Sequence, residues 1–179
     1  MFRPVKDKPA EDRALATKLD QGEGAGIEAL FERFWEPSYR AAYLIVQSRA
    51  AAEDIAQDTL LTVIGKIATF DRSMDLKPWI HRIAVNKSLD WLRSESRLTY
   101  LVDREAEDSA EAEPGLDQDL LHALGQLPPD QRSVVVLRHL FGYAPNEIAA
   151  ANKVPPGTVR AQLSRALSSL RDSLEEECS

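Results

Sequence analysis

Residues 145–174, PNEIAAANKVPPGTVRAQLSRALSSLRDSL, decide how the C-terminal half of the chain folds. They predict a short helix over 145–151, a turn over 152–155, and a long helix from Pro156 to about residue 174. Proline suits the first turn of a helix because its missing N–H group would have no partner there. A short helix, a tight turn and a long helix are the plan of a helix-turn-helix.

The long helix has two contrasting faces. One third of its circumference collects the apolar residues that we expect to be buried: Val159, Leu163, Ala166, Leu167, Leu170 and Leu174. The opposite face has small or hydrogen-bonding residues, three arginines and no acid: Gly157, Thr158, Arg160, Ala161, Ser164, Arg165, Ser168 and Arg171. Small residues allow close approach to a major groove, where arginine binds guanine or phosphate. A solvated face is the alternative, and the preceding helix and turn favour DNA contact.

The same helical spacing of apolar residues runs through the rest of the chain, without the alternation that strands need. The first half is predicted to contain a break at Pro37, a polar loop over 71–77, and helices over 27–34, 39–46, 51–70 and 78–97. The second half is predicted to begin with helices over 117–127 and 130–141, which end at Pro128 and Gly142. The predicted fold class is therefore all-α.

The net charge of -7 argues against a DNA-binding protein until it is located along the chain. Residues 103–119 hold eight acids and one base, and residues 175–177 are three further glutamates. The remainder is mildly basic, so nucleic-acid binding stays open. The acidic stretch has few large apolar side chains and contains Pro114 and Gly115, which predicts a flexible linker over 98–116.

Two further polar stripes lie on predicted helices of the first half. One recurs at intervals of four and three: Arg82, Asn86, Asp90, Arg93 and Arg97. Its cations also suit the dipole at a helix C-terminus, so DNA contact and a structural role are equally open. The other is acidic, at i, i+3, i+4 and i+7: Asp54, Gln57, Asp58 and Leu61. A plain exposed surface is the simpler interpretation of this stripe, and a docking site for a basic helix is the alternative.

The sequence does not indicate a catalytic or metal site. His81, His122 and His139 are scattered, Cys178 is the single cysteine, and there is no glycine-rich phosphate loop or activated nucleophile. We therefore predict no enzyme activity, no metal, no cofactor and no small-molecule substrate. The longest apolar runs fall far short of a bilayer span and the N-terminus has no apolar signal core. These features predict a cytoplasmic protein without membrane insertion.

Several motifs together resemble the extracytoplasmic-function (ECF) sigma factors of the sigma-70 family, over about residues 26–174. Residues 52–60, AEDIAQDTL, are similar to the helix that binds core RNA polymerase. Residues 79–86, WIHRIAVN, followed by Asp90 and Arg93, are similar to the helix that faces the minus-ten promoter element. The part that reads the minus-thirty-five element is similar to LPPDQR at 127–132, EIA at 147–149, GTVR at 157–160 and SRAL at 164–167. The order and spacing of these motifs on one chain carry the resemblance.

The resemblance implies a function and a role for each surface. The chain would be a bacterial RNA polymerase sigma factor that directs promoter-specific transcription initiation in a stress or envelope response. Core polymerase would contact Asp54, Gln57, Asp58 and Leu61. The minus-ten element, with a base flipped into the loop over 71–77, would contact Arg72, Lys77, Trp79, Arg82, Asn86, Lys87 and Arg93. The minus-thirty-five element would contact Thr158, Arg160, Ala161, Ser164 and Arg165.

The resemblance also implies partners and a division into domains. The partners would be core RNA polymerase, through the coiled coil of its largest subunit and its flap, promoter DNA, and an anti-sigma factor. Residues 1–22 would be an N-terminal segment and residues 23–97 a sigma region 2 domain of three to four helices. The acidic linker over 98–116 would lie in the RNA channel of polymerase, and residues 117–175 would form the helix-turn-helix domain of sigma region 4.

Some positions depart from the family pattern. Asn152 and Lys153 occupy the turn, where an apolar residue followed by glycine is common, and Ala144 stands where a capping serine is frequent. Gln162 and Leu167 replace arginines, which predicts fewer phosphate contacts and a modest affinity for the minus-thirty-five element. These departures leave one alternative, a sigma mimic that sequesters an anti-sigma factor without binding DNA. A helix-turn-helix repressor is a third interpretation, which leaves the first half unexplained.

Overall fold

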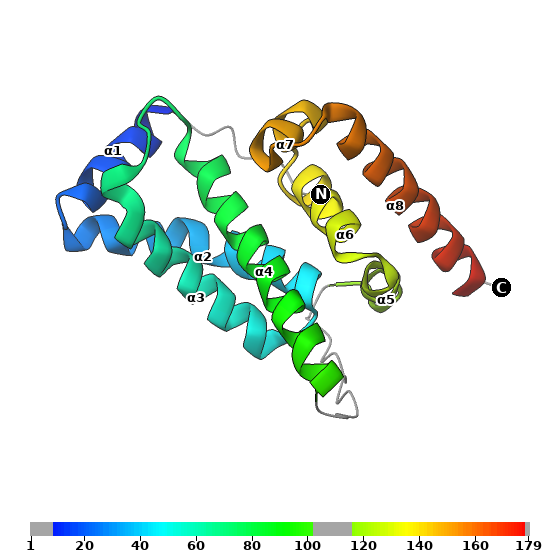
Figure 1. Ribbon diagram of the computed structural model, residues 1–179. Helices are drawn as coiled ribbons and strands as arrows, with labels where there is room; N and C mark the ends of the chain where they lie inside the picture. Colours follow the sequence, from blue (N-terminus) through cyan, green and yellow to red (C-terminus); the bar gives the residue numbers. More distant parts are fainter. Residues whose placement is uncertain (1–8, 102–115, 178–179) are drawn as a thin grey trace.

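The computed structural model describes residues 9–101 and 116–177, and every regular element among them is helical (Figure 1). The predicted all-α fold is therefore confirmed. Of the predicted linker over 98–116, residues 98–101 continue a helix and the rest lies almost entirely outside the described residues.

In the N-terminal half, residues 9–101 form four α-helices and one 3₁₀ turn. They are α1 (Pro9–Asp20), α2 (Gly24–Val46), α3 (Arg49–Lys66), the 3₁₀ turn η1 (Ile67–Thr69) and α4 (Leu76–Leu101). α1 was not predicted from the sequence, and it buries Leu15, Ala16 and Leu19 against the other helices. α3 begins at the N-cap Ser48, whose hydroxyl accepts a hydrogen bond from the amide of Ala51.

The predicted break at Pro37 is wrong, because α2 runs through it as one helix of 23 residues. Proline removes one backbone hydrogen bond and clashes with the preceding turn, which usually ends or bends a helix. Here the residues on both sides of Pro37 are fully buried, with Phe34, Ser38 and Ala41 all at 1% exposure or less. Packing along both halves of α2 therefore outweighs the local cost of the proline.

The C-terminal half contains the predicted helix-turn-helix. Its elements are α5 (Gln118–Gln126), α6 (Pro129–Val135), the π-helical segment η2 (Val136–Leu140), α7 (Pro145–Asn152) and α8 (Pro156–Glu177). The helix predicted over 130–141 thus changes from α to π geometry in its second half. Gly142, which follows η2, has a φ angle of 79° and ends the helix as predicted.

The predicted buried seam of α8 needs one correction. Val159, Leu163, Ala166 and Leu170 are buried, but Leu167 is 41% exposed. Leu167 lies next to Ala166 at the edge of the apolar stripe, where its side chain stays partly exposed. An exposed leucine costs little, so the stripe tolerates it.

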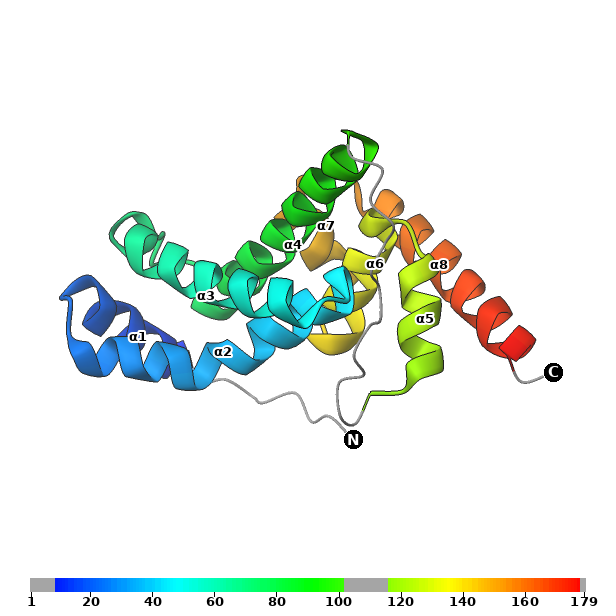
Figure 2. The ribbon, with the colours of Figure 1, turned by 90° about the horizontal axis from the view of Figure 1, so that it is seen from below.

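The apolar core divides into two clusters that do not follow the two halves of the chain. One cluster lies inside the N-terminal half, between α1, α2, α3, η1 and α4. The other joins the end of α2, the start of α3 and the middle of α4 to α5, α6, η2, α7 and α8. The two halves are therefore packed directly against each other, with α6 beside α4 and α5 near the end of α2 (Figure 2).

Candidate functional site

The predicted minus-thirty-five residues lie together on the outer face of α8. Thr158, Arg160, Ala161, Ser164 and Arg165, which we call the α8 face, are all exposed. Val159 and Leu163 point to the opposite side and are buried, which fixes the rotation of the helix. The amide of Thr158 donates to the carbonyl of Pro155 at 2.9 Å and closes the first turn.

Two hydrogen bonds hold the arginines of the α8 face. The guanidinium of Arg160 donates to Oδ1 of Asn146, in the first turn of α7, at 3.0 Å. Nε of Arg165 donates to the carbonyl of Ala161 at 3.3 Å. Asn146 was not among the residues predicted from the sequence, although its place as a polar residue in the first turn of the preceding helix is a signal that could have indicated it. The first helix of the motif thus orients an arginine of the second.

The turn of the helix-turn-helix places a non-glycine residue in a left-handed backbone conformation. Lys153 has a φ angle of 55° and a ψ angle of 40°, in the left-handed region that favours glycine. The amide of Val154 donates to the carbonyl of Ala149 at 3.1 Å and ends α7. At the other end of α7, Ala144 has no capping side chain, and its amide donates instead to Glu147 at 2.6 Å.

The predicted polymerase-binding residues form an exposed stripe on α3. Asp54, Gln57, Asp58 and Leu61, which we call the α3 stripe, are all exposed, and Leu61 is exposed at 54%. Ile55 and Val63 lie on the other side of the helix and are buried. A leucine exposed to this extent beside two carboxylates gives the stripe both an apolar and an acidic character, which suits a docking surface.

The predicted minus-ten residues lie along α4 and the loop before it, and several already have partners in the protein. Lys87 pairs with Asp58 of the α3 stripe, and Arg93 pairs with Asp90 at 2.8 Å. Arg82 donates to the carbonyl of Ala151 at 3.4 Å, across to the C-terminal half. Asn86 is exposed, and Lys77 is half-buried.

The loop between η1 and α4 is an ordered turn. Oδ1 of Asp71 accepts hydrogen bonds from the amide and the hydroxyl of Ser73, at 2.9 and 2.7 Å. These bonds favour the charged carboxylate and lower the pKa of Asp71. Arg72 pairs with Asp20 at the end of α1 at 3.1 Å, and Trp79 packs on Phe70 with ring centroids 4.7 Å apart. The loop predicted to capture a base is therefore tied to helices at both ends.

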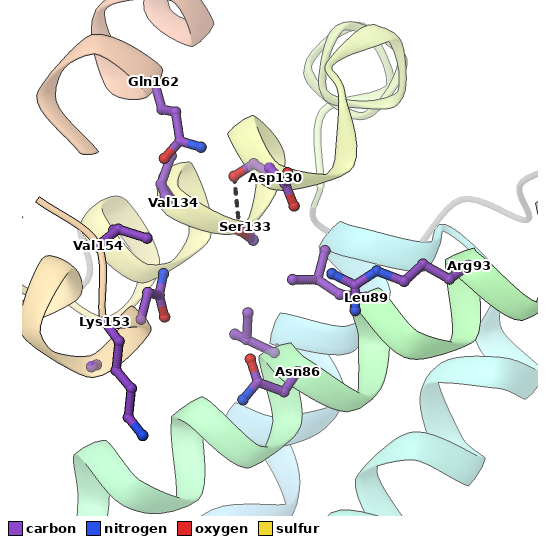
Figure 3. A pocket seen from close by; sticks show the side chains of 12 residues that line it. Asn86, Leu89, Arg93, Asp130, Ser133, Val134, Lys153, Val154 and Gln162 are labelled. Atoms are coloured by element: carbon purple, nitrogen blue, oxygen red, sulfur yellow. Dashed lines mark hydrogen bonds between the residues drawn. The ribbon is translucent and has the colours of Figure 1, made fainter. Parts of the chain in front are cut away.

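A cavity of about 370 Å³ separates part of α4 from the C-terminal half (Figure 3). Asn86, Leu89 and Arg93 line it from α4, while Asp130, Lys153 and Gln162 line it from the other side. Polar groups from both halves therefore face each other across this space.

The structure does not gather the three predicted surfaces into one centre. The α3 stripe and α4 are neighbours, joined by the pair of Lys87 and Asp58. α8 lies on the opposite side of the molecule from α3 in both views (Figures 1 and 2). Such separation suits extended partners that contact several faces, and it is unlike an active site, where groups converge in one pocket.

The histidines lie apart from one another. His81 is buried, whereas His122 and His139 are exposed. Within the part of the chain that the structure describes, no three histidine, cysteine or acidic side chains come together as a metal site requires. No helix among the described residues combines the length and apolar character that a membrane span needs.

The sequence matches two family models that correspond to the two halves. The model of sigma-70 region 2 matches residues 30–98, and the model of sigma-70 region 4 matches residues 117–170. A protein with these two regions is a sigma factor, which is a transcription initiation factor.

Curated relatives place the chain within one group of that family. It is 31% identical to the ECF RNA polymerase sigma factor SigE of Mycolicibacterium smegmatis, over 97% of this chain and 71% of the relative. It is 34% identical to the RNA polymerase sigma factor CarQ of Myxococcus xanthus, over 74% of this chain and 79% of the relative. The chain therefore belongs to the ECF sigma factors of the sigma-70 family, as its motifs predicted.

Solved structures agree with this assignment. The sigma factor RpoE, in complex with the anti-sigma factor NepR from Bartonella quintana, has a TM-score of 0.71 and 27% identity, covering 83% of this chain and 96% of that chain. CnrH, in complex with the cytosolic domain of CnrY, shares the fold with a TM-score of 0.70 and 23% identity, covering 92% of this chain and 97% of that chain.

Proposed function

We propose that this sigma factor binds core RNA polymerase and promoter DNA through its three polar surfaces and has no catalytic activity of its own. The α3 stripe docks on polymerase, α4 with its preceding loop reads the minus-ten element, and the α8 face reads the minus-thirty-five element. The observation that carries the proposal is the exposure of an acidic face and an acid-free face on separate sides of the molecule. The predicted domains, 23–97 and 117–175, are the units that hold these surfaces.

The α8 face has the chemistry of a major-groove reader. Arg160 and Arg165 are exposed, and Ala161 and Ser164 between them are small enough to let the helix approach the bases. Arginine binds guanine with two hydrogen bonds, and each such contact is worth about 1–3 kcal/mol of discrimination. Asn146 holds Arg160 in a defined orientation before DNA arrives, which lowers the entropy lost on binding.

The α3 stripe has the chemistry of a protein docking surface. Two carboxylates favour a basic partner, and the exposed Leu61 adds apolar area that only a protein surface would cover. The coiled coil of the largest polymerase subunit is the partner that we propose. We further propose that region 4 contacts the polymerase flap and that the protein works in the cytoplasm, where polymerase and promoters are.

We also propose control by an anti-sigma factor. A solved structure with the same fold contains such a complex, in which the sigma factor RpoE is bound to the anti-sigma factor NepR. A protein that covers α4 or the α3 stripe would block promoter or polymerase binding directly.

A run-off transcription assay tests the proposal. Core polymerase with this protein should give promoter-specific transcripts from genomic fragments, and Asp54→Ala should reduce both transcription and polymerase binding. Glu53→Ala is the matched control, because Glu53 is an exposed acid about 100° away around the same helix. If core polymerase gains no promoter selectivity, the proposal fails. Polymerase binding that survives Asp54→Ala would favour the sigma mimic.

A further inference from the structure

We propose that Asp20, the last residue of α1, is a positioning residue for minus-ten recognition. It holds the guanidinium of Arg72 in place for the base that is captured by the loop between η1 and α4. α1 thereby contributes to base selectivity, although it lies outside residues 30–98, which match the model of region 2. The inference rests on the proposed role of this loop and adds a residue that was not among the predicted contacts.

α1 packs firmly on α2, so its end is a fixed point in the fold. Its apolar residues belong to the buried core of the N-terminal half. Asp12 is 5% exposed and pairs with Arg33 of α2 at 2.6 Å. Where α2 begins, a Cβ atom on Gly26 would be 2.9 Å from the Cβ atom of Lys18. The two helices therefore approach this closely because Gly26 has no side chain.

The loop between η1 and α4 lies against α1. α1 packs beside η1 and α4, the elements on either side of the loop (Figure 1). Ala16 of α1 lines one small crevice together with Ser73 and Met74 of the loop. At the end of the helix, Oδ2 of Asp20 lies 3.1 Å from Nη2 of Arg72. An ion pair thus connects the fixed end of α1 to a side chain of the loop.

The backbone of the loop has hydrogen bonds of its own, so the pair with Asp20 acts mainly on the Arg72 side chain. Oδ1 of Asp71 accepts hydrogen bonds from the amide and the hydroxyl of Ser73. The amide of Met74 donates to the carbonyl of Asp71 at 3.0 Å. The carboxylate of Asp71 is therefore engaged within the turn, and it is Asp20 that pairs with Arg72.

A guanidinium held in this way can still bind a base. The contact with Asp20 uses only part of the N–H donors of Arg72, whose side chain is 38% exposed. The remaining donors lie in the plane of the group and can bond the edge of a base. Fixing that plane before DNA arrives lowers the entropy lost on binding and favours the base whose acceptors match it.

Two local effects disfavour an acid at position 20, so its carboxylate needs a compensating contact. The C-terminal end of a helix carries partial negative charge, which repels a carboxylate. An acid beside a DNA surface also repels phosphate groups. The pair with Arg72 offsets both effects and gives Asp20 a role that helix formation does not explain.

Transcription by core polymerase with this protein tests the proposal, on a promoter located by the run-off assay. Each minus-ten base is changed in turn to the other three bases, and the ratio of transcripts from the preferred and the other bases gives the selectivity at that position. A plain structural tie between α1 and the loop is the alternative, and it would not act on one base position.

The variants differ in whether they keep the carboxylate. Asp20→Ala removes it, and Asp20→Glu retains it. Glu23→Ala is the matched control, because Glu23 is a nearby exposed acid whose side chain does not cap α2. Circular dichroism verifies that all variants fold. Asp20→Asn, which has nearly the size of the wild-type residue, takes the place of Asp20→Ala if the alanine variant loses helix content.

We expect Asp20→Ala to lower the selectivity about two- to fivefold at one minus-ten position, which is the effect that an exposed ion pair can supply. Selectivity at the other minus-ten positions and at the minus-thirty-five element should not change. Asp20→Glu should keep most of the selectivity, and Glu23→Ala should keep all of it. The NMR order parameter of the Arg72 side chain should fall in Asp20→Ala and not in Glu23→Ala.

Three results would overturn the proposal. One is unchanged selectivity of Asp20→Ala at every minus-ten position. The second is an equal loss in Glu23→Ala, which would indicate a general effect of charge. The third is a loss spread equally over all positions that Asp20→Glu does not restore, which would indicate a structural tie alone. If the wild type gives no promoter-specific transcript, the proposed function fails instead, and the NMR result still decides whether Asp20 holds Arg72.

Discussion

Replacing Arg132 by methionine should destabilise the protein by about 3 kcal/mol. Arg132 donates to three carbonyls in a site where it is 7% exposed, and hydrogen bonds from a charged group contribute about 1.5 kcal/mol each at the lower end of their range. Methionine keeps the apolar stem but leaves three carbonyls without this donor. Burying a cation also costs free energy, and this cost is what lowers the pKa of Arg132. Methionine removes that cost, which offsets part of the loss.

Thermal and urea unfolding, followed by circular dichroism, measure this effect. A loss of 3 kcal/mol corresponds to a fall in melting temperature of roughly 6–12 °C for a chain of this size. Arg138→Met is the control, since Arg138 is an exposed arginine on the neighbouring turn with one bond, of 3.2 Å, to the carbonyl of Tyr143, and it should change stability by less than about 0.5 kcal/mol. An Arg132→Met variant as stable as the wild type, or more stable, would refute the argument and show that burying the charge costs more than its bonds return.

Three further predictions follow from the site. Asn146→Ala should relax base selectivity at the minus-thirty-five position contacted by Arg160, while Asn146→Asp, which keeps an acceptor, should retain it in a promoter-variant transcription assay. Lys153→Gly should raise the free energy of unfolding by about 1 kcal/mol in urea titrations, because glycine adopts the left-handed conformation without strain. The ordering of the loop at Asp71 should be present above the ordinary carboxyl pKa and lost as pH falls through the lowered value, which the NMR shift of the Ser73 amide would follow. An unchanged stability for Lys153→Gly, or a Ser73 shift that titrates at the ordinary carboxyl pKa, would contradict these expectations.

The helix-turn-helix and its outer face could be predicted because both depend on local sequence. Pro156 starts α8, and the spacing of its apolar residues determines which side chains turn outward. The continuous helix through Pro37 could not be predicted in this way. Its proline carries a local signal for a break, and only burial of the flanking residues by the other helices overrides that signal.

The contacts between the halves could not be predicted from the sequence, for a different reason. Arg132 lies in a stretch that resembles the family motif, yet its acceptors are main-chain carbonyls, which every residue offers and no sequence pattern marks. His81 is one of three scattered histidines, and its role depends on Phe141 and Tyr143, some 60 residues away along the chain. Contacts of this kind appear only when the tertiary arrangement is known.

Two cations of α4 that are proposed to meet DNA share a property that bears on affinity. Lys87 pairs with Asp58, and Arg93 pairs with Asp90. Each must exchange a protein partner for a phosphate or a base, so the net gain per contact is smaller than for a cation surrounded by water. The exchange for Lys87 also releases Asp58 of the α3 stripe. Binding of a basic polymerase helix to Asp58 would therefore free Lys87 for DNA. Polymerase binding at the α3 stripe would then favour DNA binding at α4.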